Sequence, residues 1–547
     1  MSIGTAQGRI LLAVIVAHLC FFATALVVRP KVDSDAAAGM LVWRSMERGA
    51  HWNSAIEPDP ADIARDRQSF MTWWSPGQYL AVGPLHSLGA SWGASIATAT
   101  LLCSLSGLLG YWWLYRSLGF APATSAWAAG ILAVAWQVTR NYGEFSGGEL
   151  ALLAVAPWLV GCIMRLRPLR LIGVLPFACI YLVGAMTKLS FCVTAAAALA
   201  GICCVEFAEA PGFRRLVGVG ARAAAMMLAA HLLLWLVFLR HGANPSSIGA
   251  HGLPWWYVLP AVLVLPAGSA LGMGSLLSRL FLFPGHALVA GPTSLAPLLW
   301  ALVLVVAAAY WALARRTRLP RDYGLLVAGM AGTYAVVLGS LIVAGAPISL
   351  EDRQFFPVGA LIIPALVELA RSGTAEAWRW TARAALLFAS AYGLVALVVH
   401  ARQNLRTANV GRSGFTQHIV SPRAMSVLHF LDDGDPGSAA GTLVYVPSPE
   451  ISFELQHARV LSTFDLALSP EELRRRTRRG RVPLLVVLSN PVLESQGRDA
   501  IVMRSFADYS PSEWKEHRVG EWTFHYQGAW PPGGRDDPMD ETHQATE

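Results

Sequence analysis

The sequence predicts an α-helical polytopic membrane protein that carries a small α/β domain after its last membrane span. Of its 547 residues, 54% are hydrophobic and 14% are charged, whereas soluble domains carry about 25% charged residues. The hydrophobic residues gather in runs that approach the length of a membrane span, about 20 mostly apolar residues, and arginines gather in the short connections between them. These observations predict a transmembrane domain over residues 1–400 and a separate domain over residues 401–547.

The first apolar run, Ile10 to Val28, is long enough to span a membrane. No small-residue cleavage site clearly follows it, so we expect a retained span rather than a signal peptide. Residues 29–92 then form a polar loop. Within it, residues 36–48 have the apolar spacing of a helix, and we expect the charged segment 58–70 to be helical as well. Both are predicted to lie on the membrane surface.

Further apolar runs follow this loop. We expect spans near residues 93–114, 124–139, 148–164, 171–187, 190–207, 217–239, 294–314, 323–346, 355–370 and 381–400. Two more apolar pieces, 255–273 and 275–291, are interrupted by prolines. They insert together or not at all, because inserting only one would invert the arginine bias of everything that follows. The sequence therefore predicts 11 or 13 transmembrane helices.

The arginines between the spans predict the orientation. If these spans are right, one side of the membrane receives Arg116, Arg165, Arg167, Arg170, Arg214, Arg215, Arg315, Arg316, Arg318, Arg321, Arg371, Arg379 and Arg383. By the positive-inside rule this side is the cytoplasm. The N-terminus is then cytoplasmic, and the loop 29–92 and residues 401–547 lie in a periplasm-like space, as in a bacterial inner membrane protein. Because these arginines mark membrane loops, the net charge of +7 does not indicate nucleic acid binding.

Residues 401–547 have the pattern of a small α/β domain. We expect strands at 442–447, 459–464 and 483–489 and helices at 421–431 and 469–479, with Ser421 and Ser469 as N-caps. The second helix contains the run Arg474 to Arg479, which could bind an anionic lipid or glycan. A solvated helix face is the favoured interpretation.

The seven cysteines all fall in apolar segments. They are therefore expected to be small core residues rather than disulfides or metal ligands.

Two acids, Asp33 and Asp35, follow the first span directly. A carboxylate at the water interface stays ionised and can face a substrate whose tail lies in the bilayer. The alternative is that they cap the helix expected to begin near Ala36. Glu149, which opens the fourth predicted span, is a further candidate acid, or it caps that helix or pairs with Arg140.

Cations at the ends of spans are candidates for binding a phosphate. Lys188 and Arg353 fit this role, and Arg140 could. The alternative for Lys188 is simple snorkelling of a long side chain to water. Tyr79, Trp74 and His51 are candidate contacts to an acceptor or within the loop, although Trp74 also fits an interfacial aromatic belt and His51 an ordinary polar contact.

Five short segments together resemble one family. They are Asp33-Ser34-Asp35 with the surface helix ending at Arg44 to Trp52, Ser75 to Leu80, Gly148-Glu149-Leu150, Met186-Thr187-Lys188 and Asp352 to Pro357. In order, spacing and predicted sidedness, they are similar to the GT-C glycosyltransferases that use polyprenyl-phosphate sugars, in particular the lipid A aminoarabinose transferase and protein mannosyltransferase group. The loop acids are Asp-Ser-Asp rather than that group's adjacent pair, and Leu189 replaces the glycine of its Thr-Lys-Gly pattern, so the choice between Asp33 and Asp35 stays open.

The resemblance implies a GT-C-like membrane enzyme. A loop aspartate would act as general base, with Glu149 as a second acid, and Lys188, Arg353 and Arg140 would bind the lipid phosphate in an outward-facing cavity. The partners would be a polyprenyl-phosphate sugar donor and an envelope lipid, glycan or protein acceptor. The sugar, the acceptor and a role for a divalent metal stay open. Two alternatives are a lipid or solute transporter or flippase, which should show internal repeats and charges near the bilayer midplane, and a catalytically inactive GT-C-like assembly protein.

Overall fold

The computed structural model describes residues 6–59, 62–72, 74–242, 254–272, 274–275, 301–308, 319–346, 348, 351–373, 375–434, 441–462, 482–495, 503 and 514–531. The chain divides into two compact units. The helical unit comprises Met1–Pro30, Thr72–Ala90 and Ala94–Leu405, and the mixed unit comprises Lys31–Met71, Ser91–Gly93 and Arg406–Glu547. Most of the first predicted loop therefore groups with the C-terminal part of the chain.

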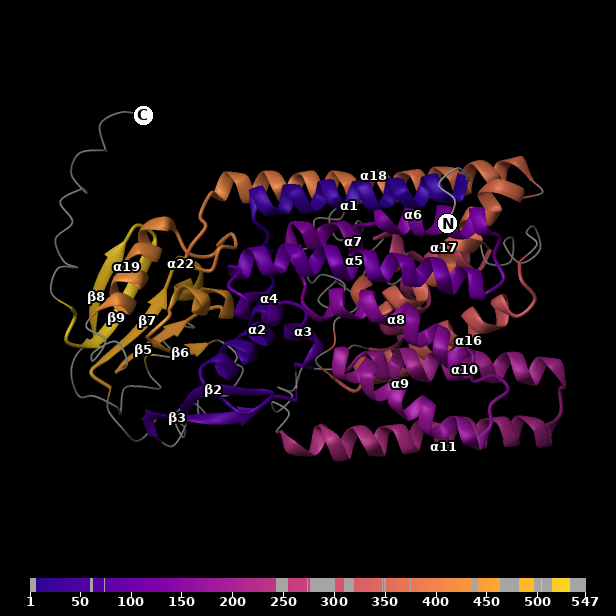
Figure 1. Ribbon diagram of the computed structural model, residues 1–547, viewed down its shortest axis with the longest axis horizontal. Helices are drawn as coiled ribbons and strands as arrows, with labels where there is room; N and C mark the ends of the chain where they lie inside the picture. The colour runs from indigo at the N-terminus through magenta and orange to yellow at the C-terminus, as the bar shows by residue number, and fades with distance from the viewer. Residues whose placement is uncertain are drawn as a thin grey trace. The chain divides into compact units, whose positions relative to one another are not determined.

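The helical unit is built from long apolar helices that run in nearly the same direction (Figure 1). Its elements are α1 (Ala6–Val28), α3 (Gly77–Leu80), α4 (Gly83–Ser87), α5 (Trp92–Ser117), α6 (Pro122–Ala133), α7 (Trp136–Thr139), η1 (Arg140–Tyr142), β4 (Glu144–Phe145), α8 (Gly148–Met164), η2 (Leu171–Gly173), α9 (Val174–Thr187), α10 (Phe191–Glu209), α11 (Phe213–Val237), η3 (Leu239–His241), α12 (Trp255–Gly268), η4 (Ser269–Leu271), α16 (Tyr323–Val343), α17 (Asp352–Ser372) and α18 (Glu376–Thr407). Among the described residues, seven helices are long and apolar enough to cross a membrane, and three apolar helical segments are shorter. The prediction of a polytopic helical membrane protein is confirmed.

The predicted spans coincide with helices wherever their residues are described. One difference is that the span expected at 124–139 is two helices, α6 and α7, separated at Val134 and Ala135. At this break α18 approaches closely, since a Cβ at Gly393 would lie 2.0 Å from the Val134 carbonyl oxygen. At the end of α7, the Thr139 hydroxyl donates to the carbonyl of Gly393 at 3.0 Å. The total of 11 or 13 spans stays a prediction, because residues 276–291 and most of 294–314 lie outside the described residues.

The mixed unit contains a five-stranded sheet with the order β6-β5-β7-β9-β8. Its elements are β1 (Lys31–Val32), α2 (Ser34–Glu47), β2 (Ser54–Asp59), β3 (Asp62–Phe70), α19 (Pro422–Asp433), β5 (Thr442–Val446), η6 (Pro449–Glu454), β6 (Arg459–Ser462), β7 (Leu484–Ser489), α22 (Pro491–Ser495), β8 (Lys515–Val519) and β9 (Trp522–Gly528). Strand β5 is parallel to β6 and β7, whereas β9 is antiparallel to β7 and β8.

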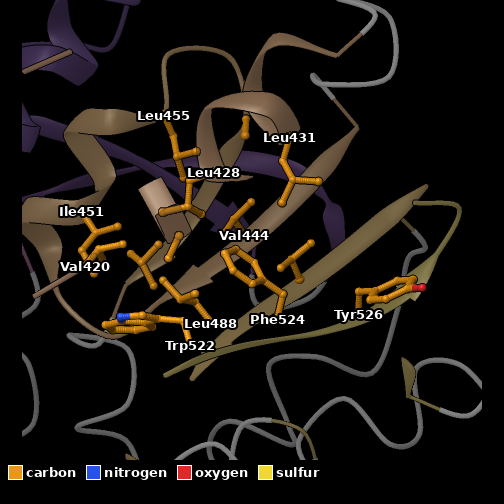
Figure 2. Close-up of a cluster of buried hydrophobic side chains, with 14 of the residues drawn as sticks. Val420, Leu428, Leu431, Val444, Ile451, Leu455, Leu488, Trp522, Phe524 and Tyr526 are labelled. Carbon is orange, nitrogen blue, oxygen red and sulfur yellow. The ribbon is translucent and has the colours of Figure 1, made fainter. Parts of the chain in front are cut away.

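One face of this sheet packs against α19. Figure 2 shows Leu428 and Leu431 of α19 pointing into the same cluster as Val444, Leu488 and Phe524 of the strands. All five side chains are buried, because the apolar stripe of an amphipathic helix covers the apolar face of a sheet.

Several C-terminal predictions are confirmed. Strands occur at Thr442–Val446, Arg459–Ser462 and Leu484–Ser489. The helix expected at 421–431 is α19, and its predicted N-cap Ser421 accepts the Ala424 N–H at 3.3 Å. Strands β8 and β9 were not predicted. The helix expected at 469–479 and the arginine run within it lie outside the described residues.

The predicted helix at 58–70 is wrong, since this segment forms most of the antiparallel hairpin β2–β3. The Arg67 Nε donates to Glu57 across the hairpin at 2.8 Å. Ile63 is buried against apolar side chains of the sheet, including Leu443 and Val487. Pairing with a neighbouring strand and burial on a distant sheet therefore override the local pattern.

Candidate active site at one end of the helical unit

Three helix ends meet at one end of the helical unit. Helix α8 begins at Gly148, α9 ends at Thr187 and α17 begins at Asp352. Close approach of the neighbouring α3 depends on glycine, because a Cβ at Gly77 would lie 2.5 Å from the Cα of Thr187. A Cβ at Gly148 would likewise lie 2.9 Å from the Cγ of Gln78.

Glu149 accepts from two cations at this meeting point. The Lys188 Nζ lies 2.5 Å from the Glu149 Oε1, and the Arg353 Nη1 lies 3.3 Å from the same oxygen. The side chains of Glu149, Lys188 and Arg353 are 16%, 18% and 19% exposed. A partly dehydrated ion pair holds its members firmly, because leaving one charge without its partner is costly. Glu149 therefore holds both cations at the mouth of the helix bundle.

Further charged groups surround this cluster. The Arg353 Nε lies 2.6 Å from Glu351 Oε2, and the Arg140 guanidinium interacts electrostatically with Glu149 and Asp352. Asp352 itself is buried and accepts the Gly274 and Ser275 N–H groups at 3.0 and 2.9 Å. It anchors the start of α17, while the neighbouring Arg353 reaches Glu149.

A small cavity of about 20 Å³ lies beside the three charged groups. It is lined by Tyr111, Gln137, Glu149, Leu152, Leu153, Ala156, Lys188, Arg353, Phe356 and Pro357. The charged side chains that line it suit the headgroup of an anionic lipid, and its apolar side chains suit the lipid tail. The volume holds about one water, so a larger ligand requires the side chains to separate.

Two of the arginines used to predict orientation, Arg165 and Arg371, lie at the opposite ends of these helices. Helix α8 carries Glu149 in its first turn and ends at Arg165, and α17 carries Arg353 in its first turn and Arg371 in its last. The two sets of charges therefore occupy different ends of the same two helices. This separation agrees with the side on which the sequence analysis placed each set.

The loop acids belong to the mixed unit, and they differ in role. Asp33 is the N-cap of α2, and its Oδ1 accepts the Asp35 N–H at 3.0 Å. Asp35 lies in the first turn of the same helix, and both side chains are partly exposed. The capping role considered for both residues is taken by Asp33, and which of the two acids is the base stays a prediction.

The predicted aromatic and histidine contacts lie in different environments. Tyr79 and Trp74 are buried within the helical unit, with 0% and 4% exposure. His51 is exposed in the mixed unit, where its backbone N–H donates to the Gln68 Oε1 at 2.8 Å. A role for these residues in contacting the acceptor stays a prediction.

Several polar residues near the candidate site were not identified from the sequence. Gln137 and Tyr111 line the cavity, and Glu351 pairs with Arg353. In the mixed unit, the buried Glu450 lies near enough to Asp33 for the charge of Asp33 to add to the rise in its pKa that burial causes. A glutamine inside an apolar run is a usable signal for Gln137, whereas nothing local marks Glu450. In the part of the chain that the structure describes, no cluster of three or more His, Cys, Asp or Glu side chains could hold a metal ion.

No protein family and no curated protein matches the chain. Its structure is similar to that of ArnT from Cupriavidus metallidurans bound to undecaprenyl phosphate, with a TM-score of 0.50 and 13% identity over 95% of this chain and 98% of that chain. The chain has the GT-C fold. This fold agrees with the resemblance carried by the five sequence segments.

The structure is also matched to arabinofuranosyltransferase AftD from Mycobacteria, with a TM-score of 0.41 and 15% identity. That match covers 94% of this chain and 41% of that chain.

Proposed function

We propose that this protein is an integral membrane glycosyltransferase that transfers a sugar from a polyprenyl-phosphate donor to an envelope lipid, glycan or protein. Transfer would occur on the outer face of a bacterial inner membrane. The observation that carries the proposal is the convergence of Lys188 and Arg353 on Glu149 where three helix ends meet. The GT-C fold supports it, and so does the undecaprenyl phosphate held by the ArnT structure that shares this fold.

The donor phosphate would bind Lys188 and Arg353, with Arg140 adding positive charge nearby. Both cations are paired with Glu149 in this structure. The donor phosphodiester carries one negative charge, as the Glu149 carboxylate does, and would replace Glu149 as the acceptor of their charge-assisted hydrogen bonds. The prenyl chain would follow the apolar wall formed by Leu152, Phe356 and their neighbours.

The chemical step would break the bond between the sugar C1 and the phosphate oxygen and form a bond from C1 to the acceptor oxygen or nitrogen. The acceptor proton would pass to the Asp35 carboxylate, and the polyprenyl phosphate would leave as an anion held by the two cations. Because C1 gains oxocarbenium character, a carboxylate base and a bound anionic leaving group both lower the barrier. Glu149, released from the cations by the phosphate, would be the second acidic side chain at the site.

The test is an incubation of the purified protein in lipid nanodiscs with a panel of polyprenyl-phosphate sugars and an envelope extract as acceptor. We expect one donor to be consumed with release of polyprenyl phosphate. Asp35→Asn should lower the rate by about 10²–10⁴-fold, as expected for a lost general base, and leave donor binding intact. Asparagine preserves the shape of the side chain, so a structural effect should be small.

Donor binding is measured separately on the cation variants. Lys188→Ala and Arg353→Ala should each weaken donor binding by about tenfold or more, as for a lost charged hydrogen bond. Glu149→Gln should bind the donor at least as tightly as the original protein while transferring sugar slowly. Arg371→Ala, at the other end of the same helix as Arg353, is the matched control and should bind normally.

Two outcomes would contradict the proposal. If Asp35→Asn and Asp33→Asn both retain normal turnover, neither loop acid is the base. If Lys188→Ala and Arg353→Ala bind the donor as tightly as the Arg371→Ala control, the phosphate does not bind where the three helix ends meet.

A further inference from the structure

In the mixed unit, distant parts of the chain form hydrogen bonds with the short helix η6 and with the residues that follow it, to Ala458. Glu454 of this helix is fully buried and accepts the Ser413 hydroxyl at 2.6 Å and the Arg412 N–H at 2.7 Å. The fully buried Asp432 of α19 accepts three N–H groups from the segment that follows η6. These are the N–H groups of Gln456, His457 and Ala458, at 2.7, 2.8 and 2.8 Å. Buried carboxylates with this many donors fix the backbone that they bind.

The carbonyl groups of the same segment bind α2. The two terminal nitrogens of Arg44 donate to the carbonyls of Ser452 and Leu455, and Arg48 donates to the carbonyl of Gln456. A guanidinium suits this arrangement because its donors form a planar fork that reaches two acceptors at once. The Arg44 guanidinium also lies 5.9 Å from the centre of the Phe453 ring.

Arg44 is committed to this backbone rather than to a carboxylate. Among the described residues it forms no ion pair within 4 Å, and burial lowers its pKa to about 9. Its guanidinium is half-buried, and its described hydrogen bonds go to backbone carbonyls. Its contribution is to hold one helix against a fixed segment.

The helix that Arg44 holds is the one that carries the loop acids. Asp33 caps α2, and Asp35 lies in its first turn. A helix rises 1.5 Å per residue, so Arg44 lies about 14 Å along the axis from Asp35. Over this distance a helix transmits its position as a nearly rigid rod.

We propose that Arg44 is a positioning residue through which η6 of the C-terminal part of the chain holds α2 and so sets the position of Asp35 for sugar transfer. The assignment of Asp35 as base rests on the proposed function, whereas the clamp of α2 does not. Arg48 adds a weaker, more exposed contact of the same kind.

The experiment measures amide hydrogen exchange across residues 36–47 of the full-length protein, together with kcat and KM for the donor. Arg44→Ala should raise exchange in α2 by about tenfold or more, as for lost charged hydrogen bonds. It should lower kcat by at least about tenfold with KM for the donor nearly unchanged, since none of the proposed donor-binding residues belongs to α2. Arg44→Lys, which restores one donor but no fork, should be intermediate in both.

The matched control is Arg65→Ala, an exposed arginine of the β3 strand in the same unit, which should leave exchange and kcat unchanged. If Arg44→Ala does not fold, Arg48→Ala should show the same changes at smaller size. Exchange in α2 equal to the control would overturn the clamp. Faster exchange in Arg44→Ala with unchanged kcat would overturn the positioning role. If the original protein transfers no sugar and Arg44→Ala still speeds exchange in α2, only the proposed function is overturned.

Discussion

Two carboxylates, Glu149 of the helical unit and Glu450 of the mixed unit, differ in what surrounds them. Glu149 lies against two cations, so its charge is balanced where it stands. Glu450, on η6, is 9% exposed, and its carboxylate accepts the Ser448 hydroxyl. Burial raises the pKa of Glu450, and the charge of Asp33 raises it further. The Ser448 hydrogen bond, a backbone hydrogen bond and the charge of Lys31 offset these effects only in part. Glu450 therefore holds its proton more tightly in the folded unit than a free glutamate does.

This shift predicts how the stability of the mixed unit depends on pH. A carboxyl group with a raised folded-state pKa binds its proton more tightly in the folded than in the unfolded state. Its favourable contribution is fully present below the ordinary glutamate pKa and is lost as pH rises through the raised value. Relative to the original protein, Glu450→Gln should become more stable over that window and be nearly equal below it. Pulse proteolysis across a pH series measures the difference, and a constant difference at every pH would contradict the prediction.

The charges at the helix ends could be predicted from the sequence, because Glu149, Lys188 and Arg353 each stand at the edge of an apolar run. That Lys188 and Arg353 would share one oxygen of Glu149 could not be predicted, since this depends on how α8, α9 and α17 pack. Arg44 looks like an ordinary surface residue in the sequence, and its partners lie more than 400 positions away. Contacts of this kind have no local signal.

At the scale of elements, the helices have a local signal in the sequence and the β2–β3 hairpin does not. The helices could be located because a membrane span needs a long apolar run, and such runs are local. The β2–β3 hairpin could not be located from the sequence, because most of β3 is exposed and includes the charged Arg65 and Arg67. Ile63 is the buried residue of this strand. Arg459 of β6 adds a second tertiary link by donating to Asp66 at 2.8 Å.

This arrangement predicts that Ile63 anchors the hairpin. Ile63→Ala should destabilise docking of the hairpin by roughly 2–5 kcal/mol, as for other large-to-small changes in a core. The half-buried Ile56 of β2 is the matched control, and Ile56→Ala should have a smaller effect. Hydrogen exchange of residues 54–70 measures both, and equal protection in the two variants would show that Ile63 is not the anchor.

At the scale of the whole molecule, the orientation derived from the arginines stays a prediction with a direct test. The seven native cysteines are free and lie within helices α1, α5, α8, α9 and α10, so a lipid environment would shield them. In spheroplasts, Val492→Cys, on α22, should react with an impermeant maleimide because the positive-inside rule places this part of the chain outside. Ala210→Cys, at the end of α10, should react only after permeabilisation. The reverse pattern would invert the orientation.

Helices α8 and α17 have a further consequence. They contain 17 and 21 residues, which correspond to about 25 and 31 Å, close to the hydrocarbon thickness of a typical bilayer of about 30 Å. Glu149 and Arg353 stand at one end of these rods and Arg165 and Arg371 at the other. In a thicker bilayer one set of charges would be drawn toward hydrocarbon, unless the lipids around the protein thinned to match. The acyl-chain length of the surrounding lipid thus determines whether Glu149 and Arg353 stay at the membrane interface.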